Sequence, residues 1–251
     1  MIRLLLLQSI TLVFFACERP GKITETKPQA IAASALDTAD PVVIPSLGYD
    51  SLLQIFLIKK KALASRYASA AESNNKAQIL DESRRLIYKQ LTQQVWPAWY
   101  GTPWDFNGTS NKPREGEIAC GYFVSTTLKH IGFNLNRYRL AQQGATAICK
   151  AFTSKLKRFS SVALMEEYLK KQSGNHLYII GLDYHVGFIQ QQDSSFMFTH
   201  ASYYDPVAVI SQRFDESSVL HGSNSYVLAS FLESDALVEN WLKGKQIYPK
   251  P

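Results

Sequence analysis

The sequence lacks several signatures that would place it in common functional classes. It has no glycine-rich phosphate-binding loop, no paired cysteine and histidine spacing of the kind that holds a metal ion, and no internal repeat. Its net charge of +6 is mild, and its Lys and Arg residues are scattered along the chain. We therefore expect no cofactor, no metal ion and no nucleic-acid partner.

Cysteine is also scarce, with three residues in the chain, and the first of them ends an apolar N-terminal run. The stretch "MIRLLLLQSITLVFFAC" has one early positive charge, Arg3, and ends in Ala16-Cys17. This layout is typical of an export signal and is too short for a convincing membrane-spanning helix. It resembles a bacterial lipoprotein signal, which predicts a signal peptide over residues 1–16 and a lipidated Cys17 that anchors the chain in the cell-envelope membrane. An ordinary signal peptide that is cut nearby is the alternative.

Composition divides the rest of the chain into three regions. Residues 17–45 hold several prolines, small residues and mixed charges without a helical or strand period, which predicts a flexible tether. Residues 46–97 have apolar residues at helical spacing and end near Pro97, which predicts a helical hairpin. Residues 98–251 contain further helical segments followed by short β-rich runs separated by polar turns. We expect an α+β fold with a nucleophile helix packed on an antiparallel sheet, in a monomer.

The segment "GEIACGYFVSTTLKHIGF" places Cys120 in the first turn of a predicted helix. A cysteine there feels the positive end of the helix dipole and the unpaired N–H groups of the first turn. Both favour the thiolate, so we expect a thiol pKa below its usual value of about 8.5. Cys149 lies within another predicted helix and is expected to act as a small buried hydrophobe. A Cys120–Cys149 disulfide is the structural alternative.

Two of the five histidines lie in predicted neighbouring strands. His185 opens the strand of "HVGFIQ" and His200 lies in "SFMFTHAS", so antiparallel pairing could bring both imidazoles to one face. Together with Cys120 they would provide a nucleophile, a base and an orienting group. We expect His130 to act as a charge partner for the end of its helix, and we place His176 and His221 on the surface.

Four segments in one order resemble the NlpC-type cell-wall cysteine peptidases, a rearranged branch of the papain-like fold. They are "YGTPWDFNGTS", "GEIACGYFV", "HVGFI" and "THAS", and together they span residues 99–202. The resemblance implies a thiol hydrolase that cleaves an amide bond of peptidoglycan stem peptides through a thioester. It also implies that Cys120 is the nucleophile, His185 the base and His200 the orienting residue.

The same resemblance suggests which residues bind substrate or stabilise the oxyanion. Trp104 stands where the family commonly has tyrosine, and its indole N–H can donate a hydrogen bond. Tyr100 is the alternative donor, Asp105 is a candidate charge at the substrate end, and Gly121 follows the nucleophile in place of the family's serine. Ala119 replaces the aspartate that usually precedes the cysteine.

Two further functions remain open from the sequence. The first is an N-acetylmuramoyl-L-alanine amidase of the related CHAP type, which cuts the link between sugar and peptide. The second is a lipoprotein without catalytic activity that uses the same fold to bind a component of the cell envelope.

Overall fold

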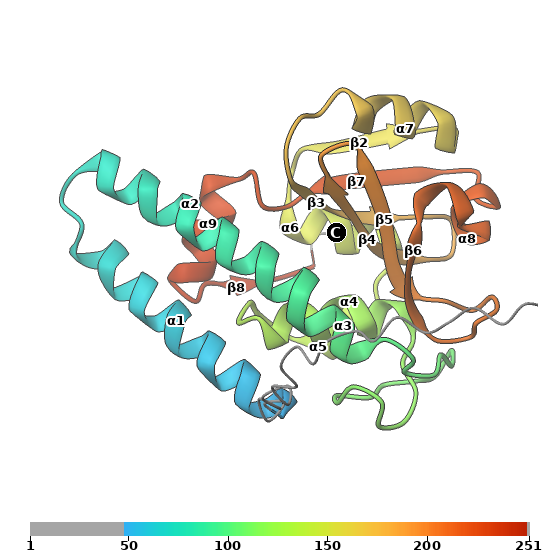
Figure 1. Ribbon diagram of the computed structural model, residues 1–251, viewed down its shortest axis with the longest axis horizontal. Coiled ribbons are helices and arrows are strands. Elements are labelled where there is room, and N and C mark those ends of the chain that lie inside the picture. Colours follow the sequence, from blue (N-terminus) through green and yellow to red (C-terminus); the bar gives the residue numbers. More distant parts are fainter. Residues whose placement is uncertain (1–47, 250–251) are drawn as a thin grey trace, which may run out of the picture. The chain divides into compact units, whose positions relative to one another are not determined.

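The computed structural model describes residues 48–249 (Figure 1). The predicted signal peptide, the lipidation site Cys17 and the predicted tether lie outside the described residues. Within the described part, no helix combines the length and apolar character needed to cross a membrane.

The helical region begins with two long antiparallel helices, α1 (Tyr49–Ser69) and α2 (Ser73–Gln90) (Figure 1). The chain continues from α2 without a break through a π-helical turn, η1 (Leu91–Val95), into the short helix α3 (Trp96–Trp99). The predicted hairpin is therefore confirmed. The π-helical turn was not predicted, because its sequence keeps the apolar spacing of an ordinary helix.

Helix α4 (Cys120–His130) begins at the candidate nucleophile, as the sequence predicts. Three further helices follow before strand β3 (His176–Gly181): α5 (Arg137–Ala141), α6 (Ala145–Phe152) and α7 (Val162–Lys170). Helix α5 lies against α4, and α6 lies against the sheet.

A six-stranded antiparallel sheet forms the rest of the fold, in the order β2-β7-β3-β4-β5-β6 (Figure 1). Its strands are β2 (Leu156–Phe159), β3 (His176–Gly181), β4 (Val186–Gln192), β5 (Ser195–Ala201), β6 (Val209–Arg213) and β7 (Tyr226–Ser230). A small parallel pair joins β1 (Asn134–Leu135) to β8 (Gln246–Ile247). The remaining elements are the 3₁₀ turn η2 (Phe214–Glu216) and the helices α8 (Ser218–His221) and α9 (Asp235–Leu242).

The two faces of the sheet bury separate apolar clusters, as expected for strands whose side chains alternate. One cluster joins the sheet to α4, α6, α9 and the helical hairpin, and it includes the fully buried Trp96, Trp99, Phe123 and Phe188. The other lies on the opposite face and includes Phe198. Because the first cluster contains side chains from both the hairpin and the sheet, the described residues 48–249 belong to one compact unit.

The α+β class is confirmed by this mixture of helices and antiparallel sheet. The expected simple order, helices first and strands second, is only partly correct. Strand β2 lies between α6 and α7, and it pairs with β7, which comes almost last in the chain. A four-residue strand with two charged residues gives no alternating apolar pattern, so the sequence did not predict it.

Candidate functional site

Cys120 is the first residue of α4 and is partly exposed. Ala119 precedes it as the N-cap and supplies no side-chain hydrogen bond, so the first-turn N–H groups stay available. Backbone N–H groups of Val186 and Gly121 contact the Cys120 sulfur. Since Val186 directly follows His185, the Cys120 sulfur contacts the residue that is next to the candidate base in the chain.

The expected lowering of the Cys120 pKa is not found. Burial raises the pKa of this thiol, and the hydrogen bonds from Val186 and Gly121 offset that effect only in part. No hydrogen bond joins the sulfur to either imidazole among the residues that the structure describes. The helix dipole lowers a thiol pKa most where the helix N-terminus is solvated, whereas the Cys120 sulfur is largely buried. The structure therefore holds a neutral thiol.

The two histidines meet as predicted. His185 Nε2 lies 2.9 Å from His200 Nδ1, and both side chains are buried. The pairing of β4 with β5 sets this approach, and Gly187 allows it, since a Cβ there would stand 2.9 Å from the His200 Cβ. The His200 ring is also stacked on Phe198 at a centroid distance of 4.0 Å, which fixes its plane.

Burial keeps both imidazoles neutral at pH 7. It lowers the pKa of His185 to about 3 and also lowers the pKa of His200, with the neighbouring His185 as a second cause. His185 Nδ1 is buried and has no hydrogen-bond partner within residues 48–249. His185 Nε2 is therefore hydrogen-bonded to His200, whereas His185 Nδ1 has no hydrogen-bond partner in the described residues.

A third polar residue, Gln212 on β6, continues this chain. Its side-chain amide lies 3.1 Å from His200 Nε2 and 2.8 Å from the hydroxyl of Ser217. With the amide nitrogen toward His200, the proton sits on His200 Nδ1, and His185 accepts at Nε2 and carries its own proton at Nδ1. A 180° flip of the amide reverses these bonds and leaves His185 Nδ1 free to accept a proton. The orientation of Gln212 thus sets the tautomer of His185.

Tyr203 is a second residue that the sequence did not single out. Its ring centroid lies 5.2 Å from that of His185 and 5.9 Å from that of Trp104. Burial raises the pKa of the Tyr203 hydroxyl, and the neighbouring Tyr204 and Cys120 raise it further. The aromatic "SYYD" segment directly after "THA" was the available signal.

The four predicted oxyanion or substrate residues differ in what they offer. The Trp104 indole nitrogen is buried without a partner in the described part of the chain, so it keeps a free N–H. The Tyr100 hydroxyl is bonded to Ser211 and Thr199, which makes it the weaker of the two candidate donors. The Asp105 carboxylate accepts the Asn107 N–H at 2.7 Å and stabilises its own turn.

Gly121 has a packing reason for its identity. A Cβ at this position would stand 2.5 Å from the backbone oxygen of Ala141 at the end of α5, so only glycine fits. The residue contributes its backbone N–H to the site and no side chain.

The second thiol and the other histidines serve elsewhere. Cys120 and Cys149 are both free, so the alternative of a disulfide between them is wrong. Cys149 is fully buried, as predicted.

His130 is hydrogen-bonded to the Tyr49 hydroxyl at 2.9 Å, and burial lowers its pKa to about 4. His130 is therefore neutral at pH 7, and its predicted role as a positive charge at the end of its helix is wrong. His176 is only partly exposed and lies beside Glu233, whereas His221 is exposed, as predicted.

Comparison of the chain with models of protein families, with curated proteins and with solved structures finds no match.

Proposed function

We propose that the chain is a cysteine hydrolase that cleaves an amide bond, with Cys120 as nucleophile, His185 as base and His200 as the group that orients the base. The observation that carries the proposal is the meeting of three distant segments. The start of α4, the start of β4 and the end of β5 place a thiol at the Val186 N–H and a coupled imidazole pair beside it.

The reaction begins from the neutral thiol and neutral imidazole. With the Gln212 amide flipped so that its oxygen faces His200, His185 Nδ1 is free to accept a proton. As substrate approaches, the thiol proton moves to His185 Nδ1, and the sulfur attacks the amide carbonyl carbon. His200 Nδ1 accepts the His185 Nε2 proton in a hydrogen bond and stabilises the imidazolium, while Gln212 Oε1 accepts from His200 Nε2. The Trp104 indole N–H and the Cys120 N–H are the donors proposed for the oxyanion.

The tetrahedral species then collapses to a thioester. The carbon–nitrogen bond breaks and the amine leaves with the proton held by His185 Nδ1. Neutral His185 next takes a proton from water, which attacks the thioester carbon and releases a carboxylic acid and the Cys120 thiol. No cofactor enters either step.

The substrate that we propose is an amide of a peptidoglycan stem peptide, and we propose that the chain is exported and held at the envelope membrane through Cys17. Both rest on the resemblance of the four motifs and on the N-terminal pattern. A finer proposal, that the core is of the papain-like NlpC type, is supported by a nucleophile helix packed on β4 and β5.

A second candidate, a binding protein without catalytic activity, is favoured by one observation. The Cys120 pKa is raised, and the sulfur makes no hydrogen bond to an imidazole in the described residues. Iodoacetamide at neutral pH separates the two functions. A hydrolase is expected to be alkylated at Cys120 in the folded state, whereas a binding protein with an inert thiol would be alkylated only after unfolding.

Digestion of purified peptidoglycan tests the proposal directly. Fragments released by the wild type and by Cys120→Ala are identified by mass, with Cys149→Ala as the matched loss of the other thiol. Loss of fragments only in Cys120→Ala supports the hydrolase. The new termini show whether the cut lies within the stem peptide or, as in a CHAP-type amidase, between sugar and peptide. Equal digestion by wild type and Cys120→Ala would contradict the proposal.

A further inference from the structure

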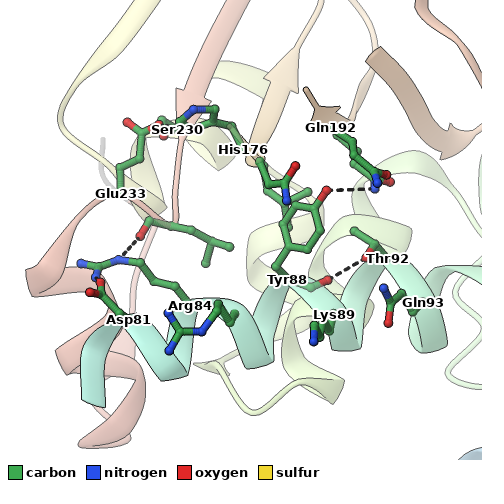
Figure 2. Close-up of a pocket in the computed structure, with 15 residues that line it drawn as sticks. Asp81, Arg84, Tyr88, Lys89, Thr92, Gln93, His176, Gln192, Ser230 and Glu233 are labelled. Atoms are coloured by element: carbon green, nitrogen blue, oxygen red, sulfur yellow. Dashed lines mark hydrogen bonds and ion pairs between the residues drawn. The ribbon is translucent and has the colours of Figure 1, made fainter. Parts of the chain in front are cut away.

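A groove of about 770 Å³ lies between α2 and the end of the sheet formed by β3, β4 and β7 (Figure 2). This volume is within the range of small-ligand sites. Its walls on the sheet come from the start of β3 and the end of β4, including His176 and Gln192. Cys120 is next to the opposite end of β4, so the groove is separate from the candidate active site.

The acidic residues at the groove are already engaged. Arg84 contacts the carboxylate of Asp81 (Figure 2) and that of Asp235. It also donates from Nε to the Leu232 carbonyl at 2.8 Å. The Glu233 carboxylate lies 2.6 Å from His176 Nδ1. Arg84 thus faces two carboxylates, and these three side chains together keep one negative charge at this end of the groove. Each of the three carboxylates, those of Asp81, Asp235 and Glu233, already has a partner within the described chain.

Two cations of the groove have no such partner. Arg85 and Lys89 make no ion pair and no side-chain hydrogen bond with any residue in the described range. Both also line the adjoining groove between α1 and α2, where Lys59 adds positive charge and Glu82 is paired with Arg66 at 2.8 Å. The ridge between the two grooves is therefore locally positive at Arg85 and Lys89, which favours an anionic ligand there.

The groove also presents free amide groups. The side chains of Gln93, Asn175 and Gln192 line it and make no hydrogen bond within residues 48–249. Ser230 Oγ lines it as well and is buried without a partner in that range. A carboxamide offers both a donor and an acceptor, which matches the alternating N–H and C=O groups of a peptide backbone. Buried polar atoms without a partner are uncommon in native structures and call for an explanation such as a ligand.

We propose that this groove binds a short acidic peptide segment. The carboxylate lies against Arg85 and Lys89, the peptide backbone bonds to the free amides, and Leu177 and Leu232 cover its apolar atoms. Lysine and arginine bind carboxylates through charge-assisted hydrogen bonds, which are the stronger class. The proposal does not rest on the hydrolase function, because none of its residues contacts the thiol or the imidazole pair.

The test is isothermal titration of the purified full-length chain with two N-acetylated four-residue alanine peptides. One carries a glutamate and a free C-terminal carboxylate, and the other carries glutamine and a C-terminal amide. We expect the acidic peptide to bind at least tenfold more tightly, and binding to weaken as salt is raised. The double variant Arg85→Gln/Lys89→Gln should raise the dissociation constant for the acidic peptide at least tenfold. Lys245→Gln, which removes an exposed positive charge elsewhere, should change it less than twofold.

Further variants separate this site from the candidate active site. Gln192→Leu removes one amide at nearly constant size and should weaken the acidic peptide several-fold, while Cys120→Ala should leave binding unchanged. Thermal unfolding checks that each variant is folded. Equal binding of the two peptides, or an unaffected double variant, would overturn the proposal. So would loss of binding in Cys120→Ala, because the peptide would then occupy the candidate active site.

Discussion

The two free cysteines of the described chain show how opposite surroundings give one side chain two roles. Cys149 is fully buried in α6, and its thiol is directed at the backbone carbonyls of Ile179 and Val227, which are acceptors. Cys120 is directed at donors, the N–H groups of Val186 and Gly121. Burial raises the pKa of both thiols, and that of Cys149 rises to about 12.

The polarity of the contacts therefore distinguishes the two sites better than the direction of the pKa shift. Acceptors around a thiol stabilise its protonated form, whereas donors stabilise the thiolate once a base removes the proton. A site of the second kind can stay neutral at rest and become ionised during a reaction.

The largest expected effect concerns turnover. Cys120→Ala should lower the release of peptidoglycan fragments by at least about 10³-fold, because a nucleophile and its base act as a unit. Cys149→Ala should keep wild-type turnover, since its contacts serve packing. Fragment release followed by mass spectrometry measures both. Equal loss of activity in Cys120→Ala and Cys149→Ala would contradict the different roles assigned to the two thiols.

The next effect tests the tautomer that Gln212 sets. Gln212→Met removes both polar atoms and should lower kcat/KM by about 10²-fold, at the low end of the contribution of general-base catalysis. Gln212→Glu presents only acceptors to His200 Nε2, so it should retain most activity.

The dependence of kcat/KM on pH distinguishes a role of Gln212 in positioning the base from a purely structural role. Gln212→Glu should shift the acid limb of kcat/KM upward, because a carboxylate beside His200 favours the charged imidazole pair. Equal activity of the Met and Glu variants, with an unchanged profile, would show that Gln212 does not position the base.

A smaller effect is expected in stability at acid pH. His185 and His130 have pKa values lowered to about 3 and about 4 by burial, so unfolding exposes groups that bind protons near their ordinary pKa of 6.5. Between pH 6.5 and the lowered pKa of each histidine, the unfolded state binds more protons than the folded state. The free energy of unfolding therefore falls as the pH decreases below 6.5. At pH 5 each such histidine should cost about 2 kcal/mol relative to pH 7.

Urea denaturation at pH 7 and pH 5 measures this loss. His130→Gln removes one of the groups while keeping a polar partner for Tyr49, so its stability should fall less between the two pH values than that of the wild type. An identical fall in both proteins would mean that His130 is not held neutral in the folded state.

The smallest effect concerns the packing of the second thiol. Cys149→Ala should lower the free energy of unfolding by about 1 kcal/mol, as expected for removal of one buried atom from a closely packed core. Cys120→Ala should change it by less, because Cys120 is partly exposed. Urea denaturation at pH 7 gives both values, and a larger loss in Cys120→Ala would reverse the comparison.

The sequence predicted those parts of the fold that have a clear period or position. The helix that begins at Cys120, the strand that holds His200, and the helical hairpin all follow from apolar spacing and from breakers such as Pro97. His185 was predicted to open a strand, but strand β4 begins one residue later, at Val186. Strand β2 could not be predicted, because four residues with two charges show no period and are defined only by pairing with β7.

The candidate site was predictable where motifs mark it and unpredictable where tertiary contacts define it. Gln212 and Tyr203 join the site only through the pairing of β5 with β6 and the turn between them. The raised pKa of Cys120 likewise depends on what covers the helix terminus, which no local pattern records.

Strand β4 also sets a length scale for experiments on this protein. From Val186 at the thiol to Gln192 at the groove it spans six residue steps, or about 20 Å at roughly 3.3 Å per residue. A four-residue peptide is too short to reach both places at once, so small probes report on each separately. Only a longer polymer could contact the groove and the candidate active site at the same time. For such a molecule, strand β4 would set the distance between the site of binding and the site of cleavage.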